Sequence, residues 1–207
     1  MSHDAMQVSN TTKAKSGNDF QNKFYQKACL LLGDSAQVRN NNYYQILVRA
    51  EEDKTESDVE VVFKHDKKTK FIFECTTTIR NDRYRSKDAQ AEGIINYLKG
   101  QGIKCCYCLV MPDDEYYVGK NADKERHFNE VFADKINNKK NITSDNCSFL
   151  QLMLRESEAL AFIEEMQTFD NFDVTYIVNE WRQRLRDAVA AKKQVDLPEI
   201  EQLSFFD

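Results

Sequence analysis

Three carboxylates stand at alternate positions in two neighbouring apolar segments of the chain, and they are the residues best suited to hold an ion. Side chains alternate between the two faces of a β-strand, so Asp58 and Glu60 share one face of the first segment, SDVEVVF. The same rule puts Glu74 and Thr76 on one face of the second segment, FIFECTT. A short polar loop joins the segments, and the simplest packing of this hairpin turns both polar faces toward one cleft.

Carboxylates that converge repel one another unless a cation compensates them, and a hard divalent ion with oxygen ligands is the usual solution. Such an ion lowers the pKa of bound water and stabilises the charge that builds on a phosphodiester under in-line attack. We therefore expect Mg²⁺, for which Mn²⁺ can substitute, held by Asp58, Glu60 and Glu74. The alternative is that these carboxylates form the solvated face of a half-exposed hairpin.

A basic segment overlaps and follows the acidic strands. Residues 64–87 contain eight Lys and Arg against three Asp and Glu, a net charge of +5, whereas the whole chain carries −5. Arginine pairs with phosphate in bidentate fashion, and a tyrosine can stack on a base or sugar. We expect nucleic-acid contacts from Arg80, Arg83, Tyr84 and Arg85, on one face of an otherwise acidic protein. A solvated surface is the ordinary alternative for any charge run.

The surrounding pattern predicts an α/β fold with a central mixed sheet flanked by helices. One domain is expected over 17–193, between a disordered N-terminus (1–16) and a tail (194–207). The first helix should start near Asn18 and stop at Gly33. Strands are predicted at 43–50, 58–65, 70–77 and 103–112, with a helix at 87–100 between the last two and further helices at 123–137, 149–167 and 172–193.

The passage from SDVEVVF to FIFECTTT resembles the two-strand core of the PD-(D/E)XK restriction-endonuclease-like nucleases, in which an acid on one strand precedes (D/E)-x-K on the next. Either Asp58 or Glu60 corresponds to the first acid, with Asp58 favoured by residue type, and Glu74-Cys75-Thr76 corresponds to the second motif. The resemblance covers about residues 18–112. It implies a restriction-endonuclease-like core and a metal-dependent DNA endonuclease of restriction, repair or phage-defence type. Cleavage of RNA is a further option.

Thr76 departs from the family pattern, because it stands where the family has lysine and its hydroxyl cannot serve as a cation. The chain is then either a catalytically inactive module that binds nucleic acid or a sliding clamp, or an enzyme with a displaced lysine. Lys87 begins the following helix, from which displaced lysines reach the metal in several family members. Gln90 and Tyr97 resemble residues on this helix in some branches, and Gln21 falls where many members carry a glutamate. The expected catalytic set is Asp58, Glu60, Glu74, Thr76 and Lys87, with Gln90 added to the nucleic-acid contacts.

The C-terminal pentapeptide QLSFF, residues 202–206, resembles the QL(S/D)LF motif by which bacterial replication and repair proteins dock on the sliding clamp. An extended tail can anchor apolar side chains in a preformed groove, and those expected to make the contact are Gln202, Leu203, Phe205 and Phe206. The alternative is that the phenylalanines fold back onto the protein's own core.

The composition indicates where the protein is located and which kinds of partner and cysteine site to expect. No run of about 18 apolar residues spans a membrane and the N-terminus has no apolar signal core, so we expect a cytoplasmic protein without a membrane partner. The six cysteines lack the two CxxC pairs of a zinc site, and we interpret them as reduced core thiols. The expected partners are DNA, the bacterial sliding clamp and a second copy of the chain in a homodimer.

Overall fold

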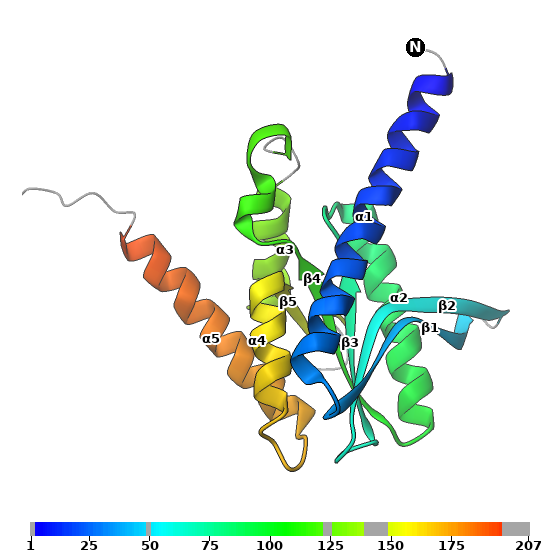
Figure 1. Ribbon diagram of the computed structural model, residues 1–207, viewed down its shortest axis with the longest axis vertical. Helices are drawn as coiled ribbons and strands as arrows, with labels where there is room; N and C mark the ends of the chain where they lie inside the picture. The colour runs from blue at the N-terminus through cyan, green and yellow to red at the C-terminus, as the bar shows by residue number, and fades with distance from the viewer. Residues whose placement is uncertain (1–2, 49–50, 122–125, 139–148, 196–207) are drawn as a thin grey trace, which may run out of the picture.

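A computed structural model describes residues 3–48, 51–121, 126–138 and 149–195 (Figure 1). The elements in chain order are α1 (His3–Leu32), β1 (Ala36–Val48), β2 (Glu51–Phe63), β3 (Thr69–Cys75), α2 (Asn81–Gly100), β4 (Lys104–Met111), the 3₁₀ turns η1 (Asp114–Tyr117) and η2 (Gly119–Asn121), α3 (Arg126–Asn137), β5 (Leu152–Arg155), α4 (Glu156–Met166) and α5 (Val174–Val195).

The five strands form one mixed sheet in the order β1-β2-β3-β4-β5. The pairs β1–β2 and β2–β3 are antiparallel, whereas β3–β4 and β4–β5 are parallel. Helix α2 is therefore the crossover between the parallel strands β3 and β4. The predicted α/β class, the hairpin of the second and third strands and the mixed sheet are confirmed.

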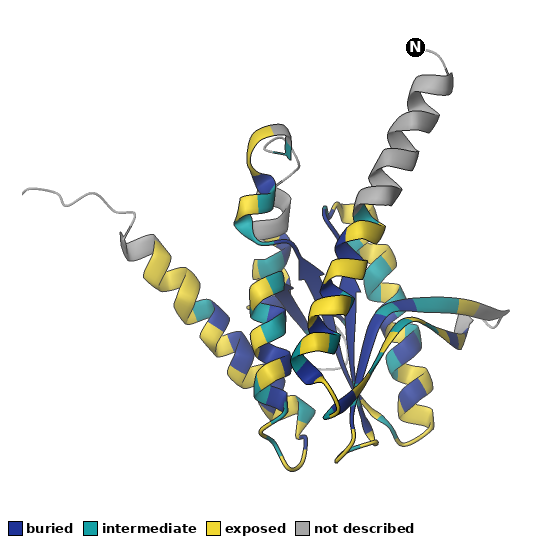
Figure 2. Cartoon of the chain, in the orientation of Figure 1, coloured by how far each residue is buried: buried dark blue, intermediate teal, exposed yellow. Residues whose placement is uncertain are grey.

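Two apolar cores cover the two faces of the sheet (Figure 2). The α1-side core lies under α1, α4 and α5, and the α2-side core lies under α2 and α3. Strand β3 divides its side chains between them by alternation, since Phe71 and Phe73 pack in the first core and Ile72 packs in the second. Glu74 is the next residue on the Ile72 face, and it is fully buried. A carboxylate is thus held on the α2 side of a buried strand, next to Ile72.

Two helices begin earlier than the sequence predicts. α1 starts at His3 rather than near Asn18, so residues 3–16, expected to be disordered, are helical. They are polar but contain no proline, and so continue the helix that Phe20, Phe24 and Ala28 anchor in the α1-side core. α2 starts at Asn81 rather than at 87, which makes the basic segment its first turns.

A fifth strand replaces the start of the helix predicted at 149–167. Leu152 and Leu154 enter the α1-side core and Met153 enters the α2-side core, as fits a strand covered on both faces. The side chain of Asn137 bonds both the N–H and the carbonyl of Met153, at 2.9 Å each, which satisfies the outer edge of β5. The pairing of β5 with β4 and the hydrogen bonds from Asn137 therefore hold residues 152–155 as a strand, although their sequence pattern predicts a helix.

The cysteines bear out the prediction of reduced thiols as far as they are described. Cys75, Cys105, Cys106 and Cys108 are buried and Cys29 is partly buried, all without a disulfide. Cys147 lies outside the described residues.

Among the helices of the described residues, none has both the length and the apolar composition needed to cross a membrane.

Candidate functional site

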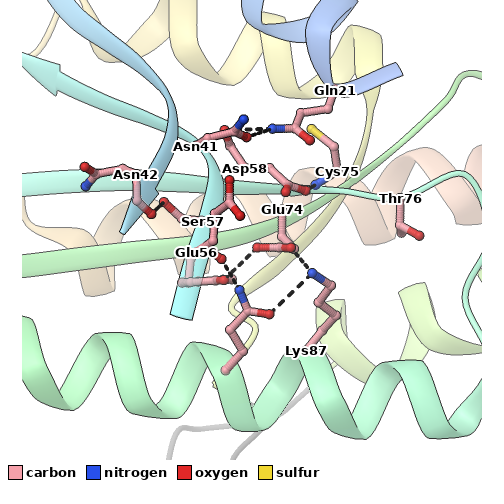
Figure 3. A network of polar contacts seen from close by, with 12 residues as sticks. Gln21, Asn41, Asn42, Glu56, Ser57, Asp58, Glu74, Cys75, Thr76 and Lys87 are labelled. Atoms are coloured by element: carbon pink, nitrogen blue, oxygen red, sulfur yellow. Dashed lines mark hydrogen bonds and ion pairs between the residues drawn. The ribbon is translucent and has the colours of Figure 1, made fainter. Parts of the chain in front are cut away.

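Asp58 and Glu74 come together at the point where strands β2 and β3 separate. The ladder between these strands ends at the pair Val59–Phe73, and in this register Asp58 and Glu74 would be the next pair. The Asp58 carboxylate instead accepts a hydrogen bond of 2.7 Å from the backbone N–H of Cys75. Where the backbone pairing of the two strands ends, the Asp58 side chain thus supplies the hydrogen-bond acceptor for Cys75. The two carboxylates lie side by side (Figure 3).

The pKa of Asp58 rises from its ordinary 3.8 to about 7. Burial is the largest cause, followed by the negative charge of Glu74 and by a hydrogen bond between the two carboxyl groups. The charge of Lys87 and the N–H of Cys75 oppose this shift without cancelling it. The pair is therefore a place where a further positive charge would be strongly stabilised.

Glu74 is held by two partners on the α2 side of the sheet. One of its oxygens forms an ion pair with Lys87 Nζ, and the other accepts a hydrogen bond of 2.9 Å from the Tyr107 hydroxyl. Burial, followed by the Glu74 charge, raises the pKa of Tyr107 well above its ordinary value, so this phenol stays protonated and donates. The Glu74 carboxylate is consequently fixed in orientation.

Lys87 reaches the site from α2, where the displaced-lysine hypothesis expected it. Its ammonium bonds Glu74 and also Gln90 Oε1, at 3.3 Å, while the Gln90 amide donates to the carbonyl of Glu56 (Figure 3). Gln90 therefore ties the lysine to strand β2. Tyr97, about two further turns along α2, instead makes an edge contact with the ring of Tyr44.

Thr76 does not join the site, contrary to our expectation. Strand β3 ends at Cys75, so the alternation that places Glu74 no longer governs the next residue. The Thr76 hydroxyl donates to the carbonyl of Thr78 at 2.6 Å, and its N–H donates to the carbonyl of Val110 at 2.9 Å. Its side chain serves the turn that leads into α2.

Glu60 is also separate from the pair, although it shares a strand face with Asp58. Its buried carboxylate bonds Lys70 Nζ at 3.1 and 3.2 Å, the Asn42 amide at 2.9 Å and the Tyr44 hydroxyl, with Arg39 at 3.5 Å. None of these contacts involves Asp58 or Glu74. The charge of Glu60 is thus neutralised by Lys70 and Arg39, apart from the Asp58–Glu74 pair with which we expected it to act.

The expected nucleic-acid contacts divide among different sides of α2. Arg83 and Gln90 precede and follow Lys87 by four and three residues, so the three share one side of the helix, whereas Arg85 lies on the opposite side. Arg80 is the N-cap residue. Tyr84 stacks on Phe132 of α3 with ring centroids 4.8 Å apart, which makes its ring a packing element and not the base platform that we expected.

A cavity of about 390 Å³ adjoins Asp58 on the α1 side of the site. It is lined by Asn18, Gln21, Asn22, Asn41, Tyr43, Glu56 and Asp58. The Gln21 amide donates to Asn40 Oδ1 at 2.9 Å, to Asn41 Oδ1 and to the Asp58 carbonyl at 3.3 Å. The glutamine singled out in the sequence is therefore part of the site's surroundings, next to the Asp58 backbone.

At Asn41 the side chains of strand β1 change the face of the sheet on which they pack. Asn41 has a φ of 55° and lies opposite Asp58 in the register of the two strands. Val38 packs with the α1-side core, whereas Tyr44 and Ile46 belong to the α2-side core, although all three would share one face of a regular strand. A left-handed residue directly across from Asp58 is a strained conformation of the kind that clusters at functional sites.

The Asp58–Glu74 pair offers carboxylate oxygens from two adjacent strands, the ligand type that Mg²⁺ prefers. Within the described residues, no group of three or more His, Cys, Asp or Glu side chains is arranged to hold a metal ion. Zn²⁺ requires three or four protein ligands, but Mg²⁺ is commonly held by one or two carboxylates together with waters and substrate phosphates. Two adjacent carboxylates, with the Asp58 pKa raised by its neighbour, form such a donor set.

Sequence reasoning missed Tyr107, Asn41, Glu56 and the cavity. The only signal for Asn41 was its place in the run Asn40–Asn42, since asparagine tolerates the left-handed region. Tyr107 lies in an apolar strand and carries no sequence signal for its contact with Glu74. The expected clamp contacts Gln202, Leu203, Phe205 and Phe206 lie outside the described residues.

Comparison of the chain with protein-family models, with curated proteins and with solved structures found no match.

Proposed function

We propose that the protein is a Mg²⁺-dependent endodeoxyribonuclease whose active centre is formed by Asp58, Glu74 and Lys87. The observation that carries the proposal is the convergence of two carboxylates from adjacent strands with a lysine ion-paired to one of them. This combination provides ligands for a divalent ion and a positive charge beside them, as phosphodiester hydrolysis requires.

We further infer that the sheet is a restriction-endonuclease-like core of the PD-(D/E)XK kind. Support comes from the order of elements, in which a helix precedes an antiparallel β1-β2-β3 meander and α2 then crosses over to a parallel β4. Further support is that Asp58 and Glu74 lie on the two strands that the motif concerns, and that Lys87 reaches Glu74 from the next helix.

Asp58 and Glu74 would hold the ion, which when bound supplies Lewis-acid stabilisation of the phosphate and lowers the pKa of a bound water. Tyr107 and Lys87 keep the Glu74 carboxylate oriented toward Asp58. The Lys87 ammonium adds a fixed positive charge next to the place where negative charge develops on the phosphate. Arg83, exposed on the same side of α2 as Lys87, is placed to bind a neighbouring phosphate of the strand.

Incubation with supercoiled plasmid, with Mg²⁺, with Mn²⁺ and with EDTA, tests the proposal. Cleavage should require the divalent ion, and Glu74→Ala should reduce it by at least about 100-fold because one of two metal ligands is lost. Glu92→Ala, which removes an exposed acid of the same helix as Lys87, is the matched control and should cut like the wild type. Wild-type cutting by Glu74→Ala would contradict the proposed centre.

A second candidate is a catalytically inactive module of the same fold that binds nucleic acid, and Thr76 in the place of the family's lysine favours it. The plasmid assay separates the two candidates when it is combined with a DNA-binding measurement. Metal-independent binding without cleavage by the wild type would identify the inactive module.

We also propose that the QLSFF peptide docks the protein on the bacterial sliding clamp. Support comes from the sequence alone, since Leu203, Phe205 and Phe206 are the apolar anchors that such a groove takes up.

A further inference from the structure

We propose that the cavity between α1 and the β1–β2 hairpin binds a single unpaired nucleobase, that of the nucleotide whose phosphate lies at Asp58. This inference rests on the proposed nuclease function, because it assigns a neighbouring part of the same substrate to the cavity. It also names the substrate class, which is DNA with an unpaired base at the cleavage position.

The lining of the cavity suits a neutral heterocycle. Four of its seven lining residues carry side-chain amides, one is a tyrosine, and the remaining two are Glu56 and Asp58. None of the seven is a lysine, arginine or histidine, and the Lys54 ammonium beside them is held over the Tyr43 ring, so the lining itself carries no positive charge for a phosphate. Amides provide both donors and acceptors, which is the combination that the edges of nucleobases present.

The size of the cavity is that of a site for one small molecule. Its volume of about 390 Å³ lies at the lower end of the range for pockets that enclose one small organic molecule. A base that enters it must therefore leave the stack, as it does in enzymes that act on extruded or single-stranded nucleotides. Tyr43 lines the cavity and is 54 % exposed, and Lys54 Nζ lies over its ring, 4.1 Å from the ring centroid. The ring face that Lys54 does not cover is the aromatic surface on which a base would stack.

The amides are held in place before any ligand binds. Gln21 is buried and makes three hydrogen bonds, to Asn40, to Asn41 and to the Asp58 carbonyl. Asn41 contributes its side chain from a left-handed backbone, a conformation that asparagine tolerates, and its Oδ1 accepts from the Gln21 amide. Preorganised polar groups of this kind lower the entropic cost of binding and make base selection efficient.

The Glu56 carboxylate decides which bases fit. Glu56 is an acceptor, so it favours bases that carry an exocyclic amino group and disfavours the exposed carbonyls of thymine. Asp58 is reserved for the proposed ion. Asparagine and glutamine amides pair readily with the donor and acceptor edge of adenine, and carboxylates accept from the amino group of cytosine. We therefore expect adenine and cytosine to bind better than thymine.

The experiment measures fluorescence anisotropy of labelled 12-nucleotide dA, dC and dT homopolymers and of a blunt 12-base-pair duplex, all in the presence of Ca²⁺. The wild type should bind dA and dC about tenfold more tightly than dT or the duplex, since one good base contact discriminates by roughly that factor. The double variant Asn18→Ala, Asn22→Ala should lose this preference, because both amides line the cavity and are exposed enough to be removed without core damage. Asn96→Ala, an exposed amide on α2, is the control and should retain it.

Equal affinity for the three homopolymers, absence of single-strand binding, or an unchanged preference in the double variant would overturn the inference. The proposed nuclease function is tested separately by Mg²⁺-dependent plasmid cleavage. Cleavage without base preference would support the nuclease function and contradict the base-binding cavity. Base preference without cleavage would support the base-binding cavity and contradict the nuclease function.

Discussion

At Asp58 and Glu74 two carboxylates share one lysine, so the pair carries one negative charge more than Lys87 neutralises. In the absence of a metal the protein relieves this charge by keeping a proton on Asp58, whose pKa rises to about 7. Because a metal ligand must be deprotonated, a bound divalent ion displaces this proton. The affinity for Mg²⁺ should accordingly weaken as the pH falls below about 7.

The raised pKa of Asp58 predicts how the stability of the metal-free protein depends on pH. Between about 4 and about 7 the folded state keeps a proton that the unfolded state has released, so stability falls as the pH rises through this window. Asp58→Asn should remove this contribution, which is on the order of a few kcal/mol. Thermal melts in EDTA from pH 8 to pH 5 measure it for both proteins. An identical pH dependence in wild type and variant would contradict the assignment.

Lys87 should promote cleavage through its positive charge next to the proposed metal ligands Asp58 and Glu74. Lys87→Ala should reduce plasmid cleavage by about 100-fold, the typical cost of removing one group that stabilises developing charge. Lys99→Ala is the matched control, because Lys99 is exposed in the last turn of the same helix and should be dispensable. Equal cleavage rates in the two variants would show that Lys87 does not compensate for Thr76.

The sequence predicted Asp58, Glu74 and Lys87 because strand alternation and helix position depend on local spacing. It did not separate Asp58 from Glu60, since both lie on one strand face and the positions of Lys70 and Arg39 on the neighbouring strands decide which is neutralised. Thr76 was misplaced because a strand pattern carries no information on the residue at which pairing stops. These distinctions depend on contacts between residues distant in the sequence.

At the scale of elements, α2 carries both Lys87 and the arginines that we propose to contact phosphate. Arg83→Ala should weaken DNA binding and reduce the slope of log K against log salt by about one unit, as the loss of one phosphate contact does. Arg85→Ala should leave the slope unchanged, because Arg85 lies on the opposite side of the helix from Lys87. Titrations at several salt concentrations measure the slopes. Equal losses in both variants would point to DNA wrapped around the N-terminus of α2 and not to one contacting side.

The pairing of β2 with β3 and the α2 crossover were predicted, and α3 and α5 lie close to their predicted bounds. Strands β1 and β2 each begin seven residues earlier than predicted, at Ala36 and Glu51 rather than 43 and 58. The beginnings of α1 and α2 and the existence of β5 were missed for different reasons. The two helix starts lie in polar segments in which periodicity fades, although the backbone continues. Strand β5 has only four residues, and its pairing with β4 and its bonds to Asn137 are tertiary contacts.

At the scale of the whole molecule, the basic segment 64–87 does not form the single patch that its charge suggested. Lys64, Lys67 and Lys68 precede β3, while the arginines and Lys87 follow it. Seven strand residues rise by about 23 Å in total, so the two groups of charges lie at opposite ends of β3. Only the second group adjoins Asp58 and Glu74. DNA binding should therefore depend on the α2 end, and the lysine loop is a solvated surface.

The role of the tail is predicted from its sequence, since residues 196–207 lie outside the described part of the chain. Pro198 disfavours helix in the residue before it, and the QLSFF peptide follows it with Leu203 and Phe206 as apolar anchors. If the peptide docks on a partner, truncation before Gln202 should abolish binding to the sliding clamp in a calorimetric titration. The melting temperature and the plasmid cleavage should then remain those of the full chain.

The variant Leu203→Ala, Phe206→Ala keeps the tail and is the control for its length, and it should lose clamp binding as the truncation does. If instead these side chains pack on the protein's own core, both changes should destabilise it by about 1.5 to 3 kcal/mol for each large apolar side chain removed from burial. Thermal melts read out that loss directly. A full-length chain that does not bind the clamp, together with a lowered melting temperature in both variants, would exclude the docking role and assign the phenylalanines to the core.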